Sequence, residues 1–457
     1  MTLTRHRAAA VELASFCADL RWAGLPREAR ERTKELVLDL IGVALRGSAA
    51  DSSRAVQAFV ATQPRGEAAV LGSDLATSAA WAALANGTGA HSTELDDVTR
   101  ESSLHPGVAV IPAALAVAQE RASTPAAFLE AVVAGYETTM RVGNALGPAS
   151  AYRRGFHPTG VAGVFGAAVA AGRLSGLAAD GLTRAIGIAG TMASGSIEYV
   201  TDGAWTKRLN PGWAAHAGIV AAGLAAAGFT GPATALDGPH GLLTGYTDEP
   251  LPELLTADLG DPLQVMKVTI KPYACCRYTH PLIDGMLALR EMHGIAPEDV
   301  QRIRLGVLSG GAVLIAEPIE RKREPANVVD AQFSAPFGAA VALVFGRAGL
   351  AEHSEQALAD PRVRALMSRT DCVRDPALDA TYPAKWEGSV EIDLRGGRTV
   401  RHHVEFALGE PENPVSRDAL VERFVELAGA RLDAEAARSL AAQLLGLDSL
   451  PELPRLS

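Results

Sequence analysis

The first group of residues whose types and spacing could do chemistry centres on the adjacent carboxylates of Asp96 and Asp97. Glu94 precedes them, and His91 and His105 flank them. Histidine can act as an acid or a base near neutral pH, and a carboxylate beside it can set its tautomer and raise its basicity. The group therefore predicts acid–base chemistry at a helix-to-loop junction. The plainer alternative is a capped helix end with solvated acids.

A second group, Tyr152, Arg154 and His157, forms a basic and aromatic turn directly before an apolar segment that begins near Val161. The start of a helix presents free N–H groups and a partial positive charge, both of which favour an anion. We therefore expect a carboxylate ligand near His157. The alternative is that Pro158 simply begins the helix and His157 is an ordinary hydrogen-bonded polar residue.

Lys207 lies between two Ala- and Gly-rich segments that are predicted to be helices. An ammonium group is expensive to bury without a partner, so this lysine either reaches the surface or holds an anion. A lone lysine is more often exposed. Only the apolar neighbourhood favours a binding role.

Lys271, Cys276 and Arg277 lie where a predicted strand ends and a helix begins, a position that often supplies ligand contacts. Cys275 and Cys276 are adjacent, whereas zinc motifs place two or more residues between paired cysteines. Neither a zinc site nor an iron–sulfur cluster is predicted from this spacing. The sequence also contains no Gly-rich phosphate loop between a strand and a helix, no G-x-S-x-G and no H-E-x-x-H motif. We therefore expect chemistry by side chains alone, with no metal and no organic cofactor.

The elements that must position these groups change in type near residue 263. Before it, helical patterns follow one another, as in Arg27–Arg46, Val108–Arg121 and Ala126–Leu146. Several are apolar almost all round, which is typical of central helices in a multilayered helical domain. The tail from Ser416 is helical again, and we expect it to pack back on this domain.

Strand patterns dominate the segment that follows. Val265–Ile270 and Val300–Leu308 alternate apolar with polar residues, and Ser389–Leu394 and Thr399–Ala407 flank a Gly–Gly turn. These strands can form one antiparallel sheet with helices between them.

A chain of 457 residues is too long for one ordinary core. We therefore predict a mostly α fold with two domains. A large all-helical domain takes in residues 1–262 and 405–457, and a smaller α+β lid domain with an antiparallel sheet takes in residues 263–404.

The overall charge and the four cysteines limit the partners and the compartment. The formal net charge is -10 and Lys and Arg form no cluster, so no nucleic-acid partner is expected. The apolar stretches are interrupted before the ~20 residues that a membrane span needs, so no membrane partner is expected. Met1–His6 lack the pattern of a secretory signal, and the cysteines suit a reducing compartment. These features favour a cytoplasmic location.

Motifs along nearly the whole chain are similar, in type and order, to those of the MmgE/PrpD family. They are NGTGAHSTELDD, LHPG, GYETTMRVGNALG, GFHPTGVAGVFGAAVAAGRLSGL, DGAWTKRLNPGWAAHAG, IKPYACCRYTH, YPAKWEGSVEIDLRGGRTV and GEPENP. Known activities in that family include 2-methylcitrate dehydratase, cis-aconitate decarboxylase and iminodisuccinate epimerase. The resemblance implies a helical domain with an α+β lid, a homodimer, and a small di- or tricarboxylate substrate handled without a cofactor.

The resemblance also implies roles for particular residues. In the decarboxylase branch, the matching acid, histidines and lysines are Glu94, His105, His157, Lys207 and Lys271. Two positions depart from that branch: Cys276 replaces a histidine, and Val98 replaces a threonine. These departures leave the substrate open.

On this basis we expect a lyase, a dehydratase or a decarboxylase, that abstracts a proton next to a carboxylate. His157 is the expected principal base or proton donor, with His105, Asp96 and Tyr152 as its acid–base partners and Lys207 holding the developing charge. The expected substrate-binding residues are Lys271, Glu94, Asp97, Arg154, Cys276 and Arg277. An epimerase or other isomerase of a dicarboxylate, and a non-catalytic carboxylate-binding or scaffold protein, remain as alternatives.

Overall fold

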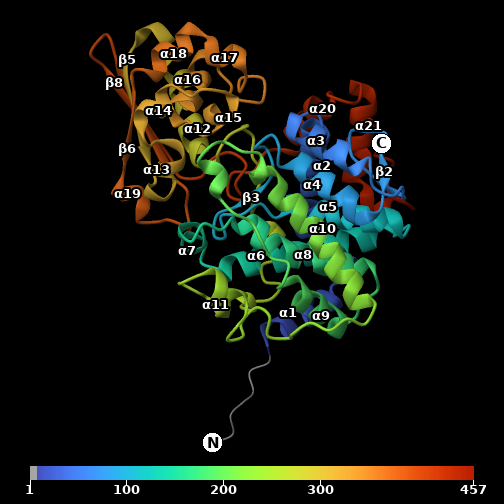
Figure 1. The fold of residues 1–457 in the computed structure, drawn as a ribbon. Helices are drawn as coiled ribbons and strands as arrows, with labels where there is room; N and C mark the ends of the chain where they lie inside the picture. The colour runs from blue at the N-terminus through green and yellow to red at the C-terminus, as the bar shows by residue number, and fades with distance from the viewer. Residues whose placement is uncertain (1–7, 457) are drawn as a thin grey trace, which may run out of the picture. The chain divides into compact units, whose positions relative to one another are not determined.

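The computed structural model describes residues 8–456, so Met1–His6, on which the expectation about a secretory signal rests, lie outside the described residues. The chain forms two compact units (Figure 1). The first takes in the described residues up to Val268 and those from Ser416 onward, and the second is Thr269–Val415. These limits lie several residues after the ones predicted from the sequence. No described helix combines the length and the apolar character needed to cross a membrane.

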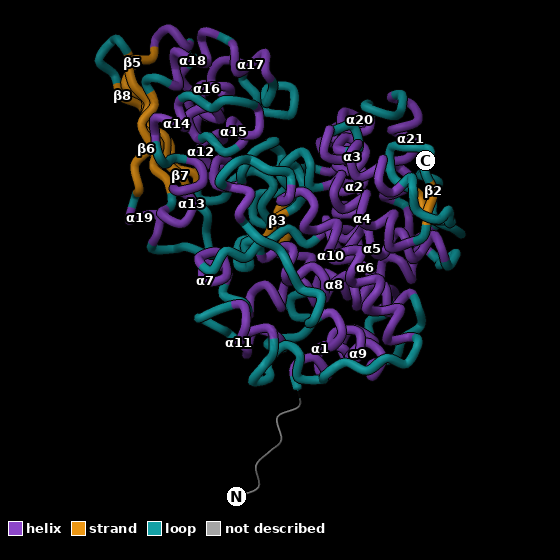
Figure 2. The backbone as a smooth tube through the Cα atoms, viewed as in Figure 1, coloured by secondary structure: helices purple, strands orange, loops and turns teal. Residues whose placement is uncertain are grey.

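The first unit is built almost entirely of helices (Figure 2). Its helices are α1 (Ala9–Asp19), α2 (Arg27–Gly47), α3 (Asp51–Val60), α4 (Ala79–Ala90), α5 (Gly107–Glu120), α6 (Pro125–Ala145), α7 (Pro148–Arg153), α8 (Pro158–Leu174), α9 (Ala179–Ala189), α10 (Thr206–Ala226), α11 (Leu242–Tyr246), α20 (Arg417–Ala428) and α21 (Ala434–Leu445). Short strands β1 (Ala68–Ala69) and β2 (Ala76–Thr77) pair with each other, and β3 (Val98–Thr99) lies between α4 and α5. The helices predicted at Arg27–Arg46, Val108–Arg121 and Ala126–Leu146 are confirmed to within about a residue at each end.

The central helices pack through small residues. Helix α8 lies against α6 and α10, and α10 also lies against α4. A β carbon on Gly87 of α4 would lie 2.8 Å from the Cα atom of Gly212 in α10, and one on Gly212 would lie 2.4 Å from the carbonyl oxygen of Leu84. Only glycine permits this approach. It fixes the end of α4, which carries His91, against the first turns of α10.

The C-terminal helices return to the first unit, as the sequence predicts. Helix α20 packs on α2, and α21 packs on both. Arg423 of α20 forms a 2.8 Å ion pair with the buried Asp39 and donates a 3.0 Å hydrogen bond to the carbonyl oxygen of Leu95. Through these contacts α20 supports the loop that carries the first group of candidate residues.

The second unit holds one four-stranded sheet in the order β6-β5-β7-β8, with helices packed on it. Its strands are β5 (Val300–Val307), β6 (Thr370–Arg374), β7 (Gly388–Leu394) and β8 (Thr399–Val404), and its helices are α12 (His280–His293), α13 (Ser309–Ile315), α14 (Ile319–Arg323), α15 (Val328–Gln332), α16 (Ala335–Phe345), α17 (Glu355–Ala359), α18 (Pro361–Met367) and α19 (Pro376–Asp379). Strand β4 (Val268–Thr269) lies at the boundary of the two units. Alternate residues of β7 are buried, so one face of the sheet is covered by helices such as α12.

Two details of the predicted sheet are wrong. The sheet is mixed, because β6 pairs parallel to β5, whereas β5, β7 and β8 are antiparallel as expected. The long helical connection from β5 to β6 allows this parallel pairing. Val265–Ile270 is not a strand of this sheet: Gln264–Lys267 form a turn of 3₁₀ helix, and only Val268–Thr269 are extended.

Candidate active site

A buried carboxylate shared by two histidine rings forms the centre of the candidate site, in the first unit. Oδ2 of Asp96 lies 2.8 Å from Nδ1 of His91 and 2.9 Å from Nδ1 of His105. Asp96 and His91 are fully buried, whereas the side chain of His105 is 12% exposed. His105 is therefore the most exposed of these three residues. We call His91, Asp96, His105 and His157 the histidine cluster.

The hydrogen bonds of His105 define which of its nitrogens carries the proton. Besides Asp96, Nδ1 of His105 faces the carbonyl oxygen of Asp97 at 2.7 Å. A carbonyl oxygen can only accept, so Nδ1 must donate. The neutral ring therefore keeps its lone pair on Nε2, which is the atom that can take a proton from a substrate.

The loop between α4 and α5 places these groups. His91 caps the C-terminus of α4, and His105 lies two residues before the start of α5. Between them, Glu94 adopts a left-handed backbone with φ of 57°, a conformation that costs free energy in a residue other than glycine. Such strained residues occur often at functional sites.

Asp97 fixes the start of α5 from the other side of the loop. Its Oδ1 accepts a 3.0 Å hydrogen bond from the backbone N–H of Gly107, and its Oδ2 accepts a 2.7 Å hydrogen bond from the hydroxyl of Tyr136 in α6. Burial, together with the neighbouring charge of Asp96, raises the pKa of Asp97 to about 7. Through these two hydrogen bonds Asp97 connects the loop of the histidine cluster to α5 and α6.

His157 lies against His91 at the beginning of α8. The two rings are nearly parallel with centroids 5.8 Å apart, and Tyr199 meets His157 edge-on. Nδ1 of His157 lies 3.1 Å from Nδ2 of Asn210 in α10. Burial lowers the pKa of His157 well below its usual value, and the nearby His91 and Lys207 lower it further. His157 is therefore neutral at physiological pH.

Lys207, in the first turn of α10, forms an ion pair with Glu94. The Glu94 carboxylate and the Lys207 ammonium group are both largely buried, at 8% and 14% side-chain exposure. Arg208 follows on the same helix and donates a 3.1 Å hydrogen bond to Ser52. The ion pair thus holds an ammonium group close enough to His157 to influence its pKa.

Two family models match most of the chain. The model of the MmgE/PrpD N-terminal domain matches residues 11–255, and the model of the MmgE/PrpD C-terminal domain matches residues 273–447. The chain belongs to the MmgE/PrpD family.

Curated relatives of this MmgE/PrpD protein include lyases. It is 29% identical to the cis-aconitate decarboxylase-like protein oryM of Aspergillus oryzae, over 97% of this chain and 95% of the relative. It is 28% identical to the cis-aconitate decarboxylase of Aspergillus terreus, over 97% of this chain and 94% of the relative. A shorter match, 35% identical over 21% of this chain and 22% of the relative, is to the 2-methylcitrate dehydratase of Cupriavidus necator.

The other predicted site residues of the MmgE/PrpD chain have contacts outside the histidine cluster. Tyr152 donates a 3.1 Å hydrogen bond to the carbonyl oxygen of Ser103 in the loop before His105. Arg154 forms an ion pair with Asp248 near the surface.

Three more of them belong to the second unit. Lys271 and Cys276 are buried there, and the buried Arg277 forms an ion pair with Glu410. The roles assigned to these residues from sequence stay predictions.

Three residues of the site escape the sequence-based selection: Tyr136, Tyr199 and Asn210. His91 belongs to the first group of candidate residues but has no role predicted from the sequence, and the structure places its Nδ1 2.8 Å from Oδ2 of Asp96. Tyr136 and Tyr199 reach the site from segments distant in sequence, so no local spacing marks them. Asn210 follows Lys207 by three residues, and helical spacing alone places it on a neighbouring face.

The histidine cluster also offers a set of donors that a metal ion could use. Within residues 8–456, His91, Asp96 and His105 bring one ligand atom each within 4.8 Å of one another. Both Nδ1 atoms, however, face the same Asp96 oxygen at hydrogen-bond distance, and Nδ1 of His105 also faces the Asp97 carbonyl oxygen. An ion taking these atoms would have to replace three hydrogen bonds, so the arrangement fits protonated Nδ1 atoms better than metal ligands.

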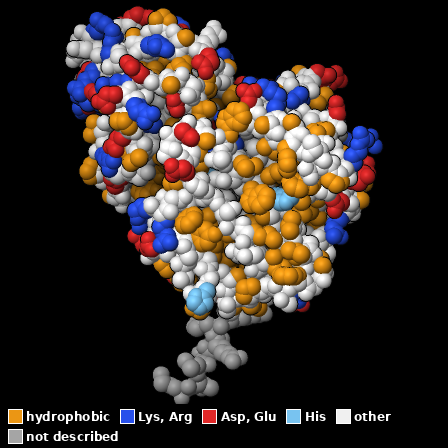
Figure 3. Space-filling model, viewed as in Figure 1, with side chains coloured by type: hydrophobic (Ala, Val, Ile, Leu, Met, Phe, Trp, Pro, Cys, Tyr) orange, Lys and Arg blue, Asp and Glu red, His pale blue; other side chains and the backbone are white. Residues whose placement is uncertain are grey.

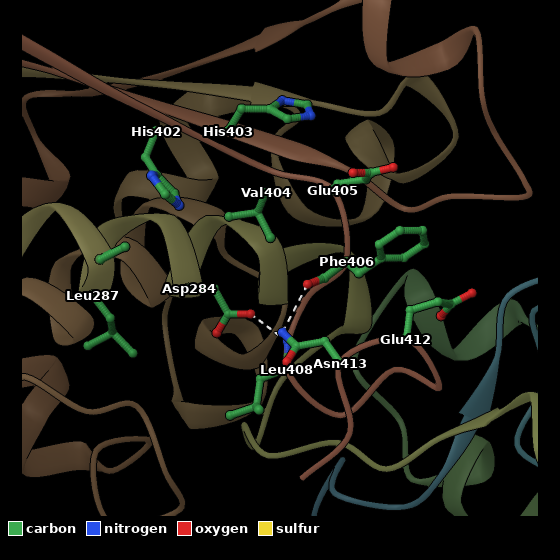
Figure 4. A pocket seen from close by; sticks show the side chains of 11 residues that line it. Asp284, Leu287, His402, His403, Val404, Glu405, Phe406, Leu408, Glu412 and Asn413 are labelled. Atoms are coloured by element: carbon green, nitrogen blue, oxygen red, sulfur yellow. Dashed lines mark hydrogen bonds between the residues drawn. The ribbon is translucent and has the colours of Figure 1, made fainter.

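A surface hollow of about 550 Å³ lies in the second unit and contains none of the predicted site residues (Figure 4). His402, Glu405 and Glu412 are among its lining residues. Both oxygens of Asp284 at its base are occupied, one by the hydroxyl of Tyr273 and one by the backbone N–H of Leu408. Asp284 is therefore held by groups of the second unit itself.

Proposed function

We propose that this MmgE/PrpD enzyme is a lyase that acts on a small di- or tricarboxylate by moving a proton at the carbon next to a carboxylate. The observation that carries the proposal is the geometry of His105, whose Nδ1 is held by Asp96 and the Asp97 carbonyl oxygen while its ring reaches the surface of the cluster. The relatives named as cis-aconitate decarboxylases and as a 2-methylcitrate dehydratase act on acids of this class.

His105 is the proposed base. Its Nε2 takes the proton from carbon, and the imidazolium that forms is stabilised by the Asp96 carboxylate at 2.9 Å. A carbon next to a carboxylate is a weak acid in water, so the negative charge that develops needs a cation nearby. Lys207 supplies it from the buried pair with Glu94, in surroundings where a charge acts more strongly than in water.

His105 moves a proton in opposite directions in the two reactions: from carbon in dehydration and to carbon in decarboxylation. In dehydration, the C–H bond breaks, its electron pair forms the new double bond, and the proton taken by His105 passes to the neighbouring hydroxyl, which leaves as water. In decarboxylation, Nε2 of His105 first takes a proton from solvent, the C–C bond to the departing CO₂ breaks with its electron pair left on the substrate as a carbanion, and His105 returns its proton to that carbanion. Relatives named as decarboxylases match along almost the whole chain, whereas the dehydratase match is short, so cis-aconitate is the first substrate to test.

A proton-exchange screen in deuterated water tests the proposal. The enzyme, dialysed against a chelator, is incubated with cis-aconitate, 2-methylcitrate, citrate and iminodisuccinate, and NMR follows loss of the α-proton signal and formation of product. Product that has lost CO₂ or water, formed without added metal or cofactor, is the expected result. Exchange with change of configuration alone would replace the lyase with an isomerase, and binding without exchange would replace it with a carboxylate-binding protein.

We also propose that the enzyme is a homodimer that pairs through the outer face of α10. Trp205, Leu209 and Trp213 repeat every four residues and are 49%, 38% and 44% exposed. Lys207 and Arg208, in contrast, turn inward to Glu94 and Ser52. Hydrophobic side chains gather over the α10 region (Figure 3), and exposed aromatic groups of this kind are enriched at protein interfaces. A second copy of the chain is the proposed occupant.

The proposed location is the cytoplasm. No disulfide joins the four cysteines, all of which lie within residues 8–456, and Cys17, Cys275 and Cys276 are buried. Adjacent thiols that are not oxidised to disulfides, such as those of Cys275 and Cys276, suit a reducing compartment.

A further inference from the structure

We propose that Asn210 holds His157 in the tautomer that carries its proton on Nε2, so that His157 is a hydrogen-bond donor to the developing negative charge and not the base. Asn210 would thus be a positioning residue. The inference rests on the proposed function and divides the chemistry between two histidines in a way that the sequence leaves open.

The orientation of the Asn210 side chain follows from its second partner. Nδ2 of Asn210 lies 3.3 Å from the carbonyl oxygen of Ser196 as well as 3.1 Å from Nδ1 of His157. The Ser196 oxygen can only accept, so it requires the amide nitrogen, with its two hydrogens, on this side. Turning the amide round would place its oxygen against the Ser196 oxygen.

An amide nitrogen has only hydrogens to give, so Nδ1 of His157 must be the acceptor. A neutral ring that accepts at Nδ1 carries its proton on Nε2. The charged ring, with hydrogens on both nitrogens, would point an N–H group at the Asn210 amide hydrogens. The buried position of His157 next to Lys207 and His91 disfavours that charged form as well.

His105 is held in the reverse way. Nδ1 of His105 faces two oxygens and carries the proton, so Nε2 of the neutral ring has a lone pair and no proton. His157 faces an amide N–H group, and its Nε2 keeps the proton. The fully buried ring of His91 contacts both, with centroids 4.9 Å from His105 and 5.8 Å from His157. Two chemically identical side chains in one cluster are thereby given opposite properties.

The difference decides what each ring can do. Nε2 of His105 can accept a proton from carbon, whereas an Nε2–H group on His157 cannot. A neutral N–H donor can instead hydrogen-bond to the carboxylate oxygen on which negative charge accumulates, next to the Lys207 ammonium group. Such a donor contributes mainly in the transition state, so its loss lowers kcat more than it raises KM.

Histidine ¹⁵N NMR tests the tautomer without any substrate. In enzyme labelled at histidine, the signals absent from His157→Gln belong to His157, and their shifts and couplings distinguish Nε2–H from Nδ1–H and from the charged ring. We expect Nε2–H in the wild type. An Nδ1–H or charged His157 would overturn the inference, whatever the activity.

Asn210→Asp reverses the polarity of the contact with almost no change of shape. A carboxylate can only accept, so we expect His157 to move its proton to Nδ1 and kcat to fall by about a hundredfold or more with a smaller change in KM. Asn210→Ala removes the donor without imposing the other tautomer, and we expect a smaller loss. Asn413→Asp, the same chemical change at an exposed loop of the second unit, serves as the control and is expected to match the wild type.

The outcomes separate this inference from the proposed function. Unchanged kcat in a folded Asn210→Asp enzyme, or an unchanged ¹⁵N signature of His157, would overturn the role of Asn210. Failure of the wild type to exchange protons with any of the acids would overturn the proposed function, while the tautomer would still be read from the NMR signals. If Asn210→Asp does not fold, the ¹⁵N signals of His157 in the wild type and the kcat of Asn210→Ala still test the role of Asn210.

Discussion

The hydroxyl of Tyr136 lies 2.7 Å from Oδ2 of Asp97, and both groups are buried. The contact joins the loop of the histidine cluster to α6. Because burial raises the pKa of Asp97 from its usual 3.8 to about 7, the stability of the protein should depend on the protonation of this one group.

We predict that Asp97→Asn reduces the loss of stability on going from pH 4 to pH 8. A raised folded-state pKa stabilises the fold fully below the unfolded value of 3.8, and this contribution is lost as the pH rises through about 7. The shift corresponds to roughly 4 kcal/mol. Thermal midpoints at pH 4 and pH 8 measure it, and an equal pH dependence in wild type and variant would contradict it.

His105→Gln should remove the proposed base. We expect kcat to fall by about 10²–10⁴-fold, the usual contribution of a general base, while the far-UV circular dichroism and the thermal midpoint stay close to the wild type. His293→Gln, at an exposed position of α12, is the control. Near-normal turnover by His105→Gln would transfer the role of base to another group.

Lys207→Ala should leave the fold intact and lower turnover by about a hundredfold or more, because the cation that stabilises the developing charge is lost. Glu94 then loses this ion pair while it stays largely buried, so Lys207→Ala combined with Glu94→Gln should recover stability without recovering activity. Lys385→Ala removes a lysine from an ion pair in the second unit and is the matched control. A fully active Lys207→Ala enzyme would remove this lysine from the mechanism.

Trp213→Glu should shift the enzyme from dimer to monomer. The charge is placed in the exposed apolar face of α10, where it must be desolvated on pairing. Light scattering coupled to size exclusion measures the mass directly. Met292→Glu introduces the same charge at a 57% exposed position of the second unit and should not change the mass. A wild-type enzyme that is monomeric at micromolar concentration would refute the dimer at once.

The sequence predicts the helical unit well because its signals are local. Apolar helices such as α5 and α6 begin at Gly, Pro or Thr residues, and these residue types mark helix boundaries whatever the tertiary structure is. Strand β6 was missed because it lies at the edge of the sheet and is only partly buried. The sequence of Thr370–Arg374 therefore lacks the alternation of apolar and polar residues that predicts a strand. The parallel pairing of β6 with β5 depends on the path of the helices between the two strands. A short stretch of sequence does not reveal that path.

The site divides in the same way. His105, Asp96, His157 and Lys207 stand in motifs of several chemically active residues and could be selected from sequence. Tyr136 and Asn210 are single polar residues on helices, and they matter only because packing brings them to Asp97 and His157. The tautomer of a histidine is a property of its neighbours in space, so the division between base and donor could not be read from the chain.

The contact between Gly87 and Gly212 has a consequence for how new substrate preferences can arise. Helix α4, which is capped by His91, and helix α10, which carries Lys207 in its first turn, meet through main-chain atoms at Gly87 and Gly212, and this contact sets the distance between them. Exchange of residues in the surrounding loops can change the side chains around the histidine cluster while leaving that spacing unchanged. The histidine cluster and Lys207 can therefore keep the same spacing while the residues around them adapt to acids of different shape, provided that both glycines are kept.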